Sequence, residues 1–349
     1  MPINEKYRVL GVMSGTSLDG IDLAICTFTK DTNWKFKIEK SETLEYTYYW
    51  KKTLSELHTR SESFISEINI EYGKLLAETI NIFLAEEKID FIASHGHTIL
   101  HQPKNNITLQ IGDGETMANL TKTKIINNFR SLDVSLNGQG APLVPIGDLH
   151  LFSEYKYCVN LGGFANISIK ENNTIIAFDI CPVNIVMNAI SKRLKLEFDM
   201  NGNLAKKGKI IPELLEELNN LPFYKRKPPK SLAREWVEEF INPLLTATYK
   251  NEDLLNTFCE HVGMQIGKLL DCNSAFFTGG GVFNTYLMSR ISHYSKAEVI
   301  IPNKETSNFK EALIFGFLGV LRLRNEVNCL QSVTGAKEDN CGGEINNPM

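Results

Sequence analysis

The sequence predicts an α/β protein built from two lobes. Its 349 residues exceed the length that one hydrophobic core usually spans, and a content of 43% hydrophobic against 22% charged residues can bury a sizeable core. Short apolar strands alternate with amphipathic helices along the chain, as is typical of α/β folds. Two glycine-containing loops, at 15–20 and 279–281, adjoin apolar strands in different halves of the chain. Together these observations predict two lobes with a central cleft.

The first lobe is expected to open with a hairpin. Residues 7–13 and 21–28 have the apolar character of buried strands and flank a polar tip that contains glycine. Apolar residues at helical spacing within 51–87 predict two amphipathic helices. Three further short strands are expected, at 91–94, 107–111 and 124–127.

A second unit is predicted to begin near residue 128, because three closely spaced strands follow in the pattern of the first hairpin. These strands are expected at 157–161, 166–170 and 175–180, with helices at 183–195, 211–219, 231–249 and 252–270. A strand at 274–278 then leads into the second glycine turn and another helix. We therefore assign residues 1–127 plus 310–349 to an N-terminal lobe and residues 128–309 to a C-terminal lobe. The polar tail from Ser332 is expected to carry little structure of its own.

Composition and charge exclude several classes of partner. A net charge of -4 without a local basic stripe gives nothing to hold a nucleic acid. Residues 1–6 lack the basic-then-apolar order of a secretion signal, and the longest apolar run, 312–321, is too short for a membrane span and reads as a buried helix. The seven cysteines are odd in number and form no paired motif. We expect a cytoplasmic protein that binds small molecules, either alone or as a homodimer.

Both glycine-containing loops are candidates for holding a nucleotide. The loop Ser14-Gly15-Thr16-Ser17-Leu18-Asp19-Gly20 has small residues that let backbone N–H groups approach a phosphate, and its hydroxyls add donors. No Gly-Lys-Ser/Thr follows, so it is not a Walker loop, and a simple hairpin turn is the alternative. Gly279, Gly280 and Gly281 lie between a strand and a helix, where a nucleotide can approach the backbone closely.

Ordered segments over most of the chain resemble the anhydro-N-acetylmuramic acid kinase family. They are Gly11-Val-Met-Ser-Gly-Thr-Ser-Leu-Asp-Gly20, Ser94-His-Gly-His-Thr98, His101-Gln-Pro103, Thr108-Leu-Gln-Ile-Gly-Asp113, Asn128-Phe-Arg130, Gly138-Gln-Gly-Ala-Pro-Leu-Val-Pro145, Asn160-Leu-Gly-Gly163, Ala165-Asn166, Pro229-Lys-Ser231, Arg234-Glu235 and Ser332-Val-Thr-Gly335. The resemblance implies the duplicated ribonuclease H-like fold of the actin/hexokinase-like kinases. It also implies an ATP- and Mg²⁺-dependent transferase of cell-wall recycling, which hydrolyses the 1,6-anhydro bond of the amino sugar and phosphorylates O6. The product would be N-acetylmuramic acid 6-phosphate.

The resemblance also implies roles for the two loops. Gly15, Thr16, Ser17, Asp19, Gly20 and Asp22 would bind the ATP phosphates, and Gly279, Gly280 and Gly281 would bind the adenosine. Asp19 and Asp22 could hold Mg²⁺, directly or through water, since this ion prefers oxygen ligands and keeps several waters. Either aspartate is equally compatible with a plain turn.

Asp179 falls on the family's catalytic aspartate, at the end of an apolar strand. There it would deprotonate the water that attacks C1, while the freed O6 attacks the γ-phosphate. A helix cap is the alternative role. The family's Asp-Thr-Gly-Pro-Gly-Asn run reads Asp179-Ile-Cys-Pro-Val-Asn184 here. A different anhydro sugar, or a nucleotide-binding sensor without turnover, is therefore an alternative function.

Three residues are predicted to contact the sugar. His97 stands where the family has glutamine, Arg130 offers a planar guanidinium that matches a carboxylate, and Glu311 matches a family position near the substrate. A surface arginine and a glutamate that complements its helix dipole are the alternatives. His-x-His spacing at 95–97 with His101 also raises the hypothesis of zinc, although no cysteine or glutamate completes a familiar ligand set.

Overall fold

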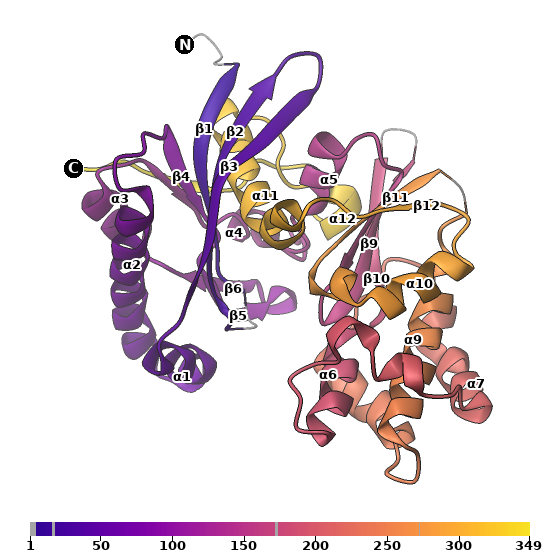
Figure 1. Cartoon of the computed structure of the whole chain (residues 1–349). Helices are drawn as coiled ribbons and strands as arrows, with labels where there is room; N and C mark the ends of the chain where they lie inside the picture. The colour runs from indigo at the N-terminus through magenta and orange to yellow at the C-terminus, as the bar shows by residue number, and fades with distance from the viewer. Residues whose placement is uncertain (1–4, 16–17, 172–173, 272) are drawn as a thin grey trace. The chain divides into compact units, whose positions relative to one another are not determined.

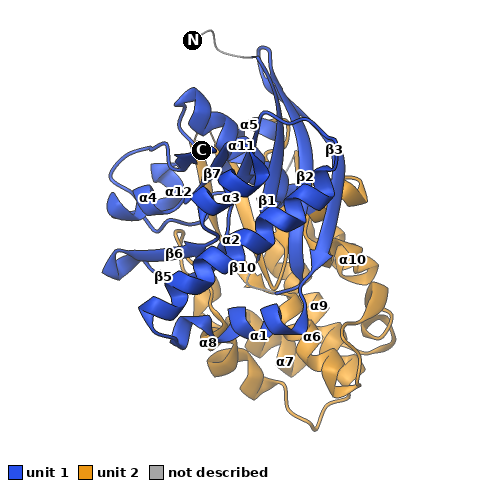
Figure 2. Ribbon diagram, turned by 90° about the vertical axis from the view of Figure 1, so that its left-hand side faces the viewer, with its two compact units in different colours: residues 1–151, 309–349 blue, residues 152–308 orange. Residues whose placement is uncertain are grey.

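The computed structural model describes residues 5–15, 18–171, 174–271 and 273–349. These residues form two compact units (Figures 1 and 2). Unit 1 comprises residues 1–151 and 309–349, and unit 2 comprises residues 152–308. The chain passes between the units twice, after Leu151 and again at Phe309, where helix α11 (Lys304–Arg324) departs from helical backbone angles.

In unit 1, the described residues form a six-stranded sheet in the order β13-β7-β4-β1-β2-β3. The strands are β1 (Lys6–Met13), β2 (Gly20–Lys30), β3 (Trp34–Glu45), β4 (Phe91–Ser94), β7 (Ile125–Asn127) and β13 (Glu344–Asn346). β1, β2 and β3 run antiparallel in sequence, and β4 and β7 continue the sheet parallel to β1. A separate hairpin pairs β5 (His97–Gln102) with β6 (Ile107–Ile111).

Helices cover both faces of this sheet. Alternate residues of β1, such as Leu10 and Val12, pack with α2 (Glu62–Leu84) in one apolar cluster. On the other face α11 lies directly against β1, since a Cβ at Gly11 would fall 1.9 Å from the carbonyl oxygen of Ala312. The remaining helices of unit 1 are α1 (Tyr48–Glu56), α3 (Gly114–Thr121), α4 (Ser131–Ser135), α5 (Pro145–Leu151) and α12 (Gln331–Thr334). Burial on both faces explains why β1 and β2 are nearly continuous apolar runs.

Unit 2 repeats the strand pattern of unit 1. Its described residues form a five-stranded sheet in the order β10-β9-β8-β11-β12, from β8 (Tyr157–Leu161), β9 (Phe164–Glu171), β10 (Thr174–Pro182), β11 (Ser274–Thr278) and β12 (Glu298–Ile300). Three antiparallel strands are again followed by two strands parallel to the first. The helices are α6 (Asn184–Arg193), α7 (Pro212–Asn220), α8 (Arg234–Trp236), α9 (Asn251–Gly267) and α10 (Thr285–Tyr294). The predicted α/β class and the predicted duplication are both confirmed.

The boundary predicted at residue 128 differs from that of the structure, because residues 128–151 belong to unit 1. Asp133, buried in α4, accepts hydrogen bonds from Thr334 and Asn340, and Asp148 in α5 forms a buried ion pair with Lys310. These contacts tie α4 and α5 to the C-terminal segment of the same unit. Local strand patterns cannot reveal them, since the partners lie far apart in sequence.

Three segments were misjudged from sequence. The C-terminal tail has its own structure: β13 pairs with β7, and Cys329 bridges to Asn340. The strand β3 was not anticipated, because charged residues alternate with Trp34 and Ile38 along an edge strand that buries only those apolar residues deeply. The region 231–249 is an irregular succession of short helical turns and not one helix.

Candidate active site

The candidate residues of unit 1 follow the carboxyl ends of its parallel strands. Ser14 follows β1, His95 follows β4, and Arg130 lies three residues beyond the end of β7. Open α/β sheets bind ligands outside these strand ends. The topology therefore brings together residues that are more than one hundred positions apart in sequence.

The predicted phosphate loop connects β1 to β2. The Leu18 N–H donates to the Gly15 carbonyl at 3.3 Å, and Leu18 has a positive φ of 60°. Gly20 is buried, and it leaves no room for a side chain, since a Cβ there would lie 2.5 Å from the Leu44 carbonyl oxygen. The predicted phosphate contacts Thr16 and Ser17 lie outside the described residues. The contribution of Gly15 and Gly20 to nucleotide binding stays a prediction.

A buried network holds the start of this loop. Ser14 Oγ lies 2.9 Å from His97 Nδ1 and 2.5 Å from the Tyr46 hydroxyl, which in turn contacts the Tyr72 hydroxyl. His97 is only 2% exposed, and burial lowers its pKa to about 4, so its imidazole is neutral at pH 7. These contacts support a role for His97 in positioning Ser14. Its direct contact with the sugar stays a prediction.

Two aspartates lie where the loop leads into β2: Asp19 in the loop and Asp22 near the start of the strand. Asp19 is exposed, whereas Asp22 is half-buried and accepts a hydrogen bond of 2.6 Å from Thr43. Burial raises the pKa of Asp22, Thr43 opposes this, and the charge of Asp19 raises it further. A cation would relieve the repulsion between the two carboxylates. Mg²⁺ is usually bound by one or two carboxylates together with substrate phosphates, so the residues present fit this ion.

Arg130 and Glu311 lie in the same region of unit 1. The Arg130 guanidinium contacts His95 and the Gly140 carbonyl, and burial lowers its pKa to about 10, so it keeps its charge at pH 7. Glu311 extends from α11 with an exposed side chain, near enough to Arg130 and Asp22 for their charges to act on it. Unit 1 thus gathers one cation and several carboxylates at one edge of its sheet.

The histidines do not form a zinc site. His95 Nε2 faces the Arg130 guanidinium, and His97 Nδ1 faces Ser14, so neither nitrogen is available to a metal. Within the described ranges, no group of three or more His, Cys, Asp or Glu side chains is placed to hold a metal ion. This hypothesis from the sequence has no support in the structure.

In unit 2, Asp179 lies at a β-bulge near the carboxyl end of β10. The pairing with β9 shifts between Asp179 and Cys181, and a bulge of this kind redirects the neighbouring side chains. The backbone N–H of Leu232 donates to Asp179 Oδ2 at 2.8 Å, and the Asp179 N–H donates to the Lys230 carbonyl at 3.0 Å. Burial raises the pKa of Asp179, and the Leu232 N–H partly offsets this. The carboxylate is therefore both fixed in orientation and more basic than an ordinary aspartate.

The residues that depart from the family run beside Asp179 face the protein core. Ile180 is 2% exposed, and Cys181 and Val183 are fully buried in the main apolar cluster of unit 2. Val183 precedes α6, and its N–H donates to the Gly163 carbonyl at 2.8 Å. The three substitutions therefore fill core volume.

The second glycine turn joins β11 to α10 at the same edge of the unit 2 sheet as the end of β10. Gly279 has a φ of 87°, and a Cβ there would lie within 2.8 Å of the Leu161 carbonyl oxygen. A Cβ at Gly281 would collide with the Leu161 side chain, whereas Gly280 is exposed and has nothing within 4 Å. Gly279 and Gly281 are thus required by packing, and Gly280 presents open backbone to a ligand.

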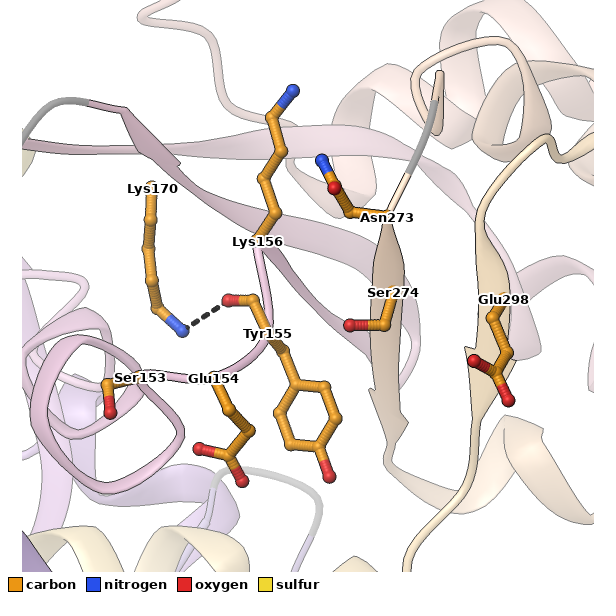
Figure 3. A pocket seen from close by; sticks show the side chains of 8 residues that line it. All are labelled: Ser153, Glu154, Tyr155, Lys156, Lys170, Asn273, Ser274 and Glu298. Atoms are coloured by element: carbon orange, nitrogen blue, oxygen red, sulfur yellow. Dashed lines mark hydrogen bonds between the residues drawn. The ribbon is translucent and has the colours of Figure 1, made fainter.

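A polar pocket of about 660 Å³ opens at the opposite edge of the unit 2 sheet (Figure 3). Lys156 precedes β8, Ser274 begins β11 and Glu298 begins β12, so the pocket lies at the amino ends of these strands. The Lys170 ammonium there donates to the Tyr155 carbonyl at 2.6 Å. The eight residues that line this pocket include none of the predicted site residues, so it is separate from the candidate active site.

Sequence reasoning missed the residues that support the predicted ones. His95 and Gly140 were not connected with Arg130, and Leu232 was not connected with Asp179. His95, Gly140 and the segment before Leu232 all occur in the segments that carry the family resemblance. Their place in these segments was the available signal, although sequence spacing alone could not show that His95 and Gly140 contact Arg130 or that Leu232 contacts Asp179.

Numbered within each unit, the first five strands of both sheets follow the order 3-2-1-4-5, and unit 1 adds β13 at the edge beyond the fifth strand. This shared order, with candidate residues at the carboxyl edges, defines the class of the protein as a duplicated ribonuclease H-like fold of the actin/hexokinase-like type. The sequence profile of the family described as anhydro-N-acetylmuramic acid kinase matches residues 7–348. The chain belongs to this family, and the resemblance seen in the sequence is confirmed.

Similar proteins include the anhydro-N-acetylmuramic acid kinases of Bacillus cereus (strain Q1) and Francisella tularensis subsp. novicida (strain U112). The first is 33% identical over 97% of this chain and 99% of its own, and the second is 34% identical over 98% of each. Among solved structures, the activator of the 2-hydroxyisocaproyl-CoA dehydratase from Clostridium difficile, with bound ADPNP, is 14% identical with a TM-score of 0.45. That match covers 91% of this chain and 97% of the activator.

No helix in the described part of the chain has both the length and the apolar character that a membrane span needs.

Proposed function

We propose that this protein is an ATP-dependent kinase that opens the 1,6-anhydro ring of anhydro-N-acetylmuramic acid with water and phosphorylates O6. The observation that carries the proposal is the carboxylate of Asp179, which is oriented by the Leu232 amide and made more basic by burial. Family membership over residues 7–348 supports the same activity. The seven cysteines, odd in number and without a paired motif, favour the reducing cytoplasm as its location.

In this reaction Asp179 accepts the proton of the water whose oxygen bonds to C1. The bond from C1 to O6 breaks, and O6 carries its electron pair to the γ-phosphorus of ATP, where the bond to the β-γ bridging oxygen breaks. The products are N-acetylmuramic acid 6-phosphate and ADP, and the proton held by Asp179 is released to solvent afterwards. One base thus serves both bond changes, because removing the proton from water is what sets O6 free as a nucleophile.

The loop of unit 1 is proposed to hold the phosphates of ATP through its backbone N–H groups, with Asp19 and Asp22 holding Mg²⁺. When bound, this ion neutralises charge on the transferred phosphoryl group. Gly280 offers the open backbone of unit 2 to the adenosine. Arg130 is proposed to bind the lactyl carboxylate of the sugar. Glu311 and His97, in the same part of unit 1, are proposed to contact the sugar as well.

The two alternative functions rested on the changed run after Asp179. A sensor without turnover, or an enzyme for another sugar, would be favoured if those changes altered the lining of the site. The side chains of Ile180, Cys181 and Val183 are buried in the core instead. This placement supports retention of the family reaction.

A coupled assay of ADP release tests the proposal. The purified protein is incubated with ATP and Mg²⁺, with and without anhydro-N-acetylmuramic acid, and the sugar product is identified by mass spectrometry. We expect ADP release that depends on the sugar and a product that has gained one water and one phosphoryl group. Sugar-independent ADP release, or none in the presence of bound sugar and ATP, would contradict the proposed function.

A further inference from the structure

The Arg130 guanidinium is held by two neutral partners. Its Nε and Nη2 lie 3.2 Å and 2.9 Å from His95 Nε2, and its Nη1 donates to the Gly140 carbonyl at 2.6 Å. Arg130 takes part in no ion pair within 4 Å among the residues that the structure describes. Its hydrogen-bond partners are neutral, and Glu311 acts on it through its charge without forming an ion pair. A carboxylate that binds to the guanidinium would compensate this half-buried charge directly.

The partners of His95 determine its tautomer. Nδ1 lies 2.9 Å from the Gly96 carbonyl, which only accepts, so Nδ1 carries the proton. The guanidinium only donates, so Nε2 presents its lone pair to Arg130. His95 is 5% exposed and its ring lies against Phe315, with 4.6 Å between ring centroids. Burial first, and the charge of Arg130 second, hold the pKa of His95 well below its usual value, which keeps the imidazole neutral.

This arrangement leaves a defined pair of donors on Arg130. A guanidinium has five N–H groups, and three of them are used by His95 and Gly140. One N–H remains on each terminal nitrogen. Two such donors in one plane match the two oxygens of a carboxylate.

The second partner of Arg130 is also fixed. Gly140 donates its N–H to Asp133 Oδ2 at 2.7 Å, and the other oxygen of Asp133 accepts from Thr334 at 2.8 Å and Asn340 at 2.9 Å. The carbonyl that receives Arg130 Nη1 is thus tied to the C-terminal segment of unit 1. With one partner on each side, the plane of the guanidinium is fixed before a ligand arrives.

We propose that His95 is a positioning residue whose Nε2 lone pair orients Arg130 for a carboxylate on the substrate, and that it thereby selects anhydro sugars that carry a carboxylate. The inference rests on the proposed function for the identity of the sugar. The role of His95 itself does not depend on the sugar. A neutral imidazole with the proton on Nδ1 determines which N–H groups of Arg130 remain for the ligand.

Two substitutions of His95 separate its two contacts. His95→Asn keeps a donor near the Nδ1 position for the Gly96 carbonyl but removes the acceptor for Arg130. His95→Gln places an amide oxygen near the Nε2 position and so keeps an acceptor for Arg130. Both remove the ring from Phe315, which makes His95→Gln a matched control for lost packing.

Binding is measured by calorimetry with a non-hydrolysable ATP analogue and two probes. One is anhydro-N-acetylmuramic acid, and the other is 1,6-anhydro-N-acetylglucosamine, which lacks the lactyl carboxylate. We expect His95→Asn to weaken the first probe by about tenfold or more, since hydrogen bonds to charged groups are strong, and to leave the second unchanged. His95→Gln should recover most of the loss. Equal weakening of both probes by His95→Asn, or no weakening of the first, would overturn the proposal.

A second measurement needs no sugar and uses a variant only to assign the His95 signal. Long-range ¹H–¹⁵N spectra of the wild-type protein report the tautomer of each imidazole, with His95 assigned as the signal absent from His95→Gln. We expect the neutral form with the proton on Nδ1 at pH 7, and a proton on Nε2 would refute the positioning role. Failure of the kinase assay with this tautomer and the selective binding intact would refute the proposed function alone.

Discussion

The two units share one strand order but carry different chemistry at their carboxyl edges. In unit 1 the loops after β1 and β7 bring Asp19 and Arg130 to that edge, and Asp22 lies there near the start of β2. In unit 2 the corresponding edge carries Asp179 at a bulge and the open backbone of Gly280. The frameworks are equivalent, so the difference lies in the residues that follow the strand ends.

In the proposed reaction, the two halves of the duplicated fold would therefore have different roles. The strands fix where each loop begins, and single residues in the loops decide whether an edge binds charge or supplies a base. The charged groups proposed to bind Mg²⁺ and the sugar carboxylate lie in unit 1, and the proposed proton acceptor lies in unit 2. Four predictions test this division.

The largest expected effect is on the chemical step, from Asp179 in unit 2. Asp179→Asn keeps the size of the side chain and an oxygen for the Leu232 amide but cannot accept a proton. We expect turnover to fall by about 10² or more, with the dissociation constant for ATP nearly unchanged. Steady-state kinetics and calorimetry measure the two quantities.

Glu298→Gln is the matched control for that variant. It neutralises an exposed carboxylate of unit 2 at the opposite edge of the sheet, in the pocket of Figure 3, and should leave turnover intact. Reaction of the wild type in ¹⁸O-water should place label at C1 of the product and none in the phosphate. Wild-type turnover by Asp179→Asn, or label in the phosphate, would refute the role of Asp179.

Asp22 in unit 1 should instead control the requirement for metal. Asp22→Asn removes one proposed ligand, so the Mg²⁺ concentration for half-maximal activity should rise by about tenfold or more. Even mutation of a residue that only hydrogen-bonds to a metal ligand can lower metal affinity by that factor. Thr43→Val removes only the 2.6 Å hydrogen bond to Asp22 and should have a smaller effect in the same direction. Removal of Mg²⁺ with a chelator should abolish turnover. An unchanged Mg²⁺ dependence in Asp22→Asn would show that the ion binds elsewhere.

The pH dependence should report Asp179 through its raised pKa. The group acts as a base only when deprotonated, and burial shifts its protonation to higher pH than for an ordinary aspartate. Activity should therefore be lost as the pH falls through a value above that ordinary pKa. The profile of kcat/KM is measured at saturating Mg²⁺, so that titration of Asp22 contributes little. If kcat/KM instead falls only at the pKa of an exposed aspartate, burial does not raise the pKa of the catalytic base.

The smallest effects should distinguish the glycines of unit 2. Gly280→Ala adds a Cβ into open space, so it should change stability by less than about 0.5 kcal/mol while raising the KM for ATP a few fold. Gly279→Ala forces a side chain into a positive φ beside the Leu161 carbonyl and should cost about 1–3 kcal/mol of folding free energy. Thermal unfolding and KM for ATP separate the two. Equal effects of both variants on KM, with no difference in stability, would contradict these assignments.

The sequence alone determined the local elements that lead into the site. Apolar runs predicted β1, β2 and β11, helical spacing predicted α1 and α2, and the loop at 14–20 and Asp179 were found because their neighbours match a family pattern. These features depend on a few consecutive residues. Period-2 and period-3.6 patterns are visible without knowledge of distant contacts.

Only the tertiary structure decided which distant residues act together. It placed residues 128–151 in unit 1 through Asp133 and Asp148, and gave the C-terminal tail a strand. It also buried the side chains of Cys181 and its neighbours in the core and placed His95 in hydrogen-bond contact with Arg130. The physical reason is that burial, pKa and hydrogen-bond partners depend on contacts between residues far apart in the chain, and those contacts are fixed only when the sheets form.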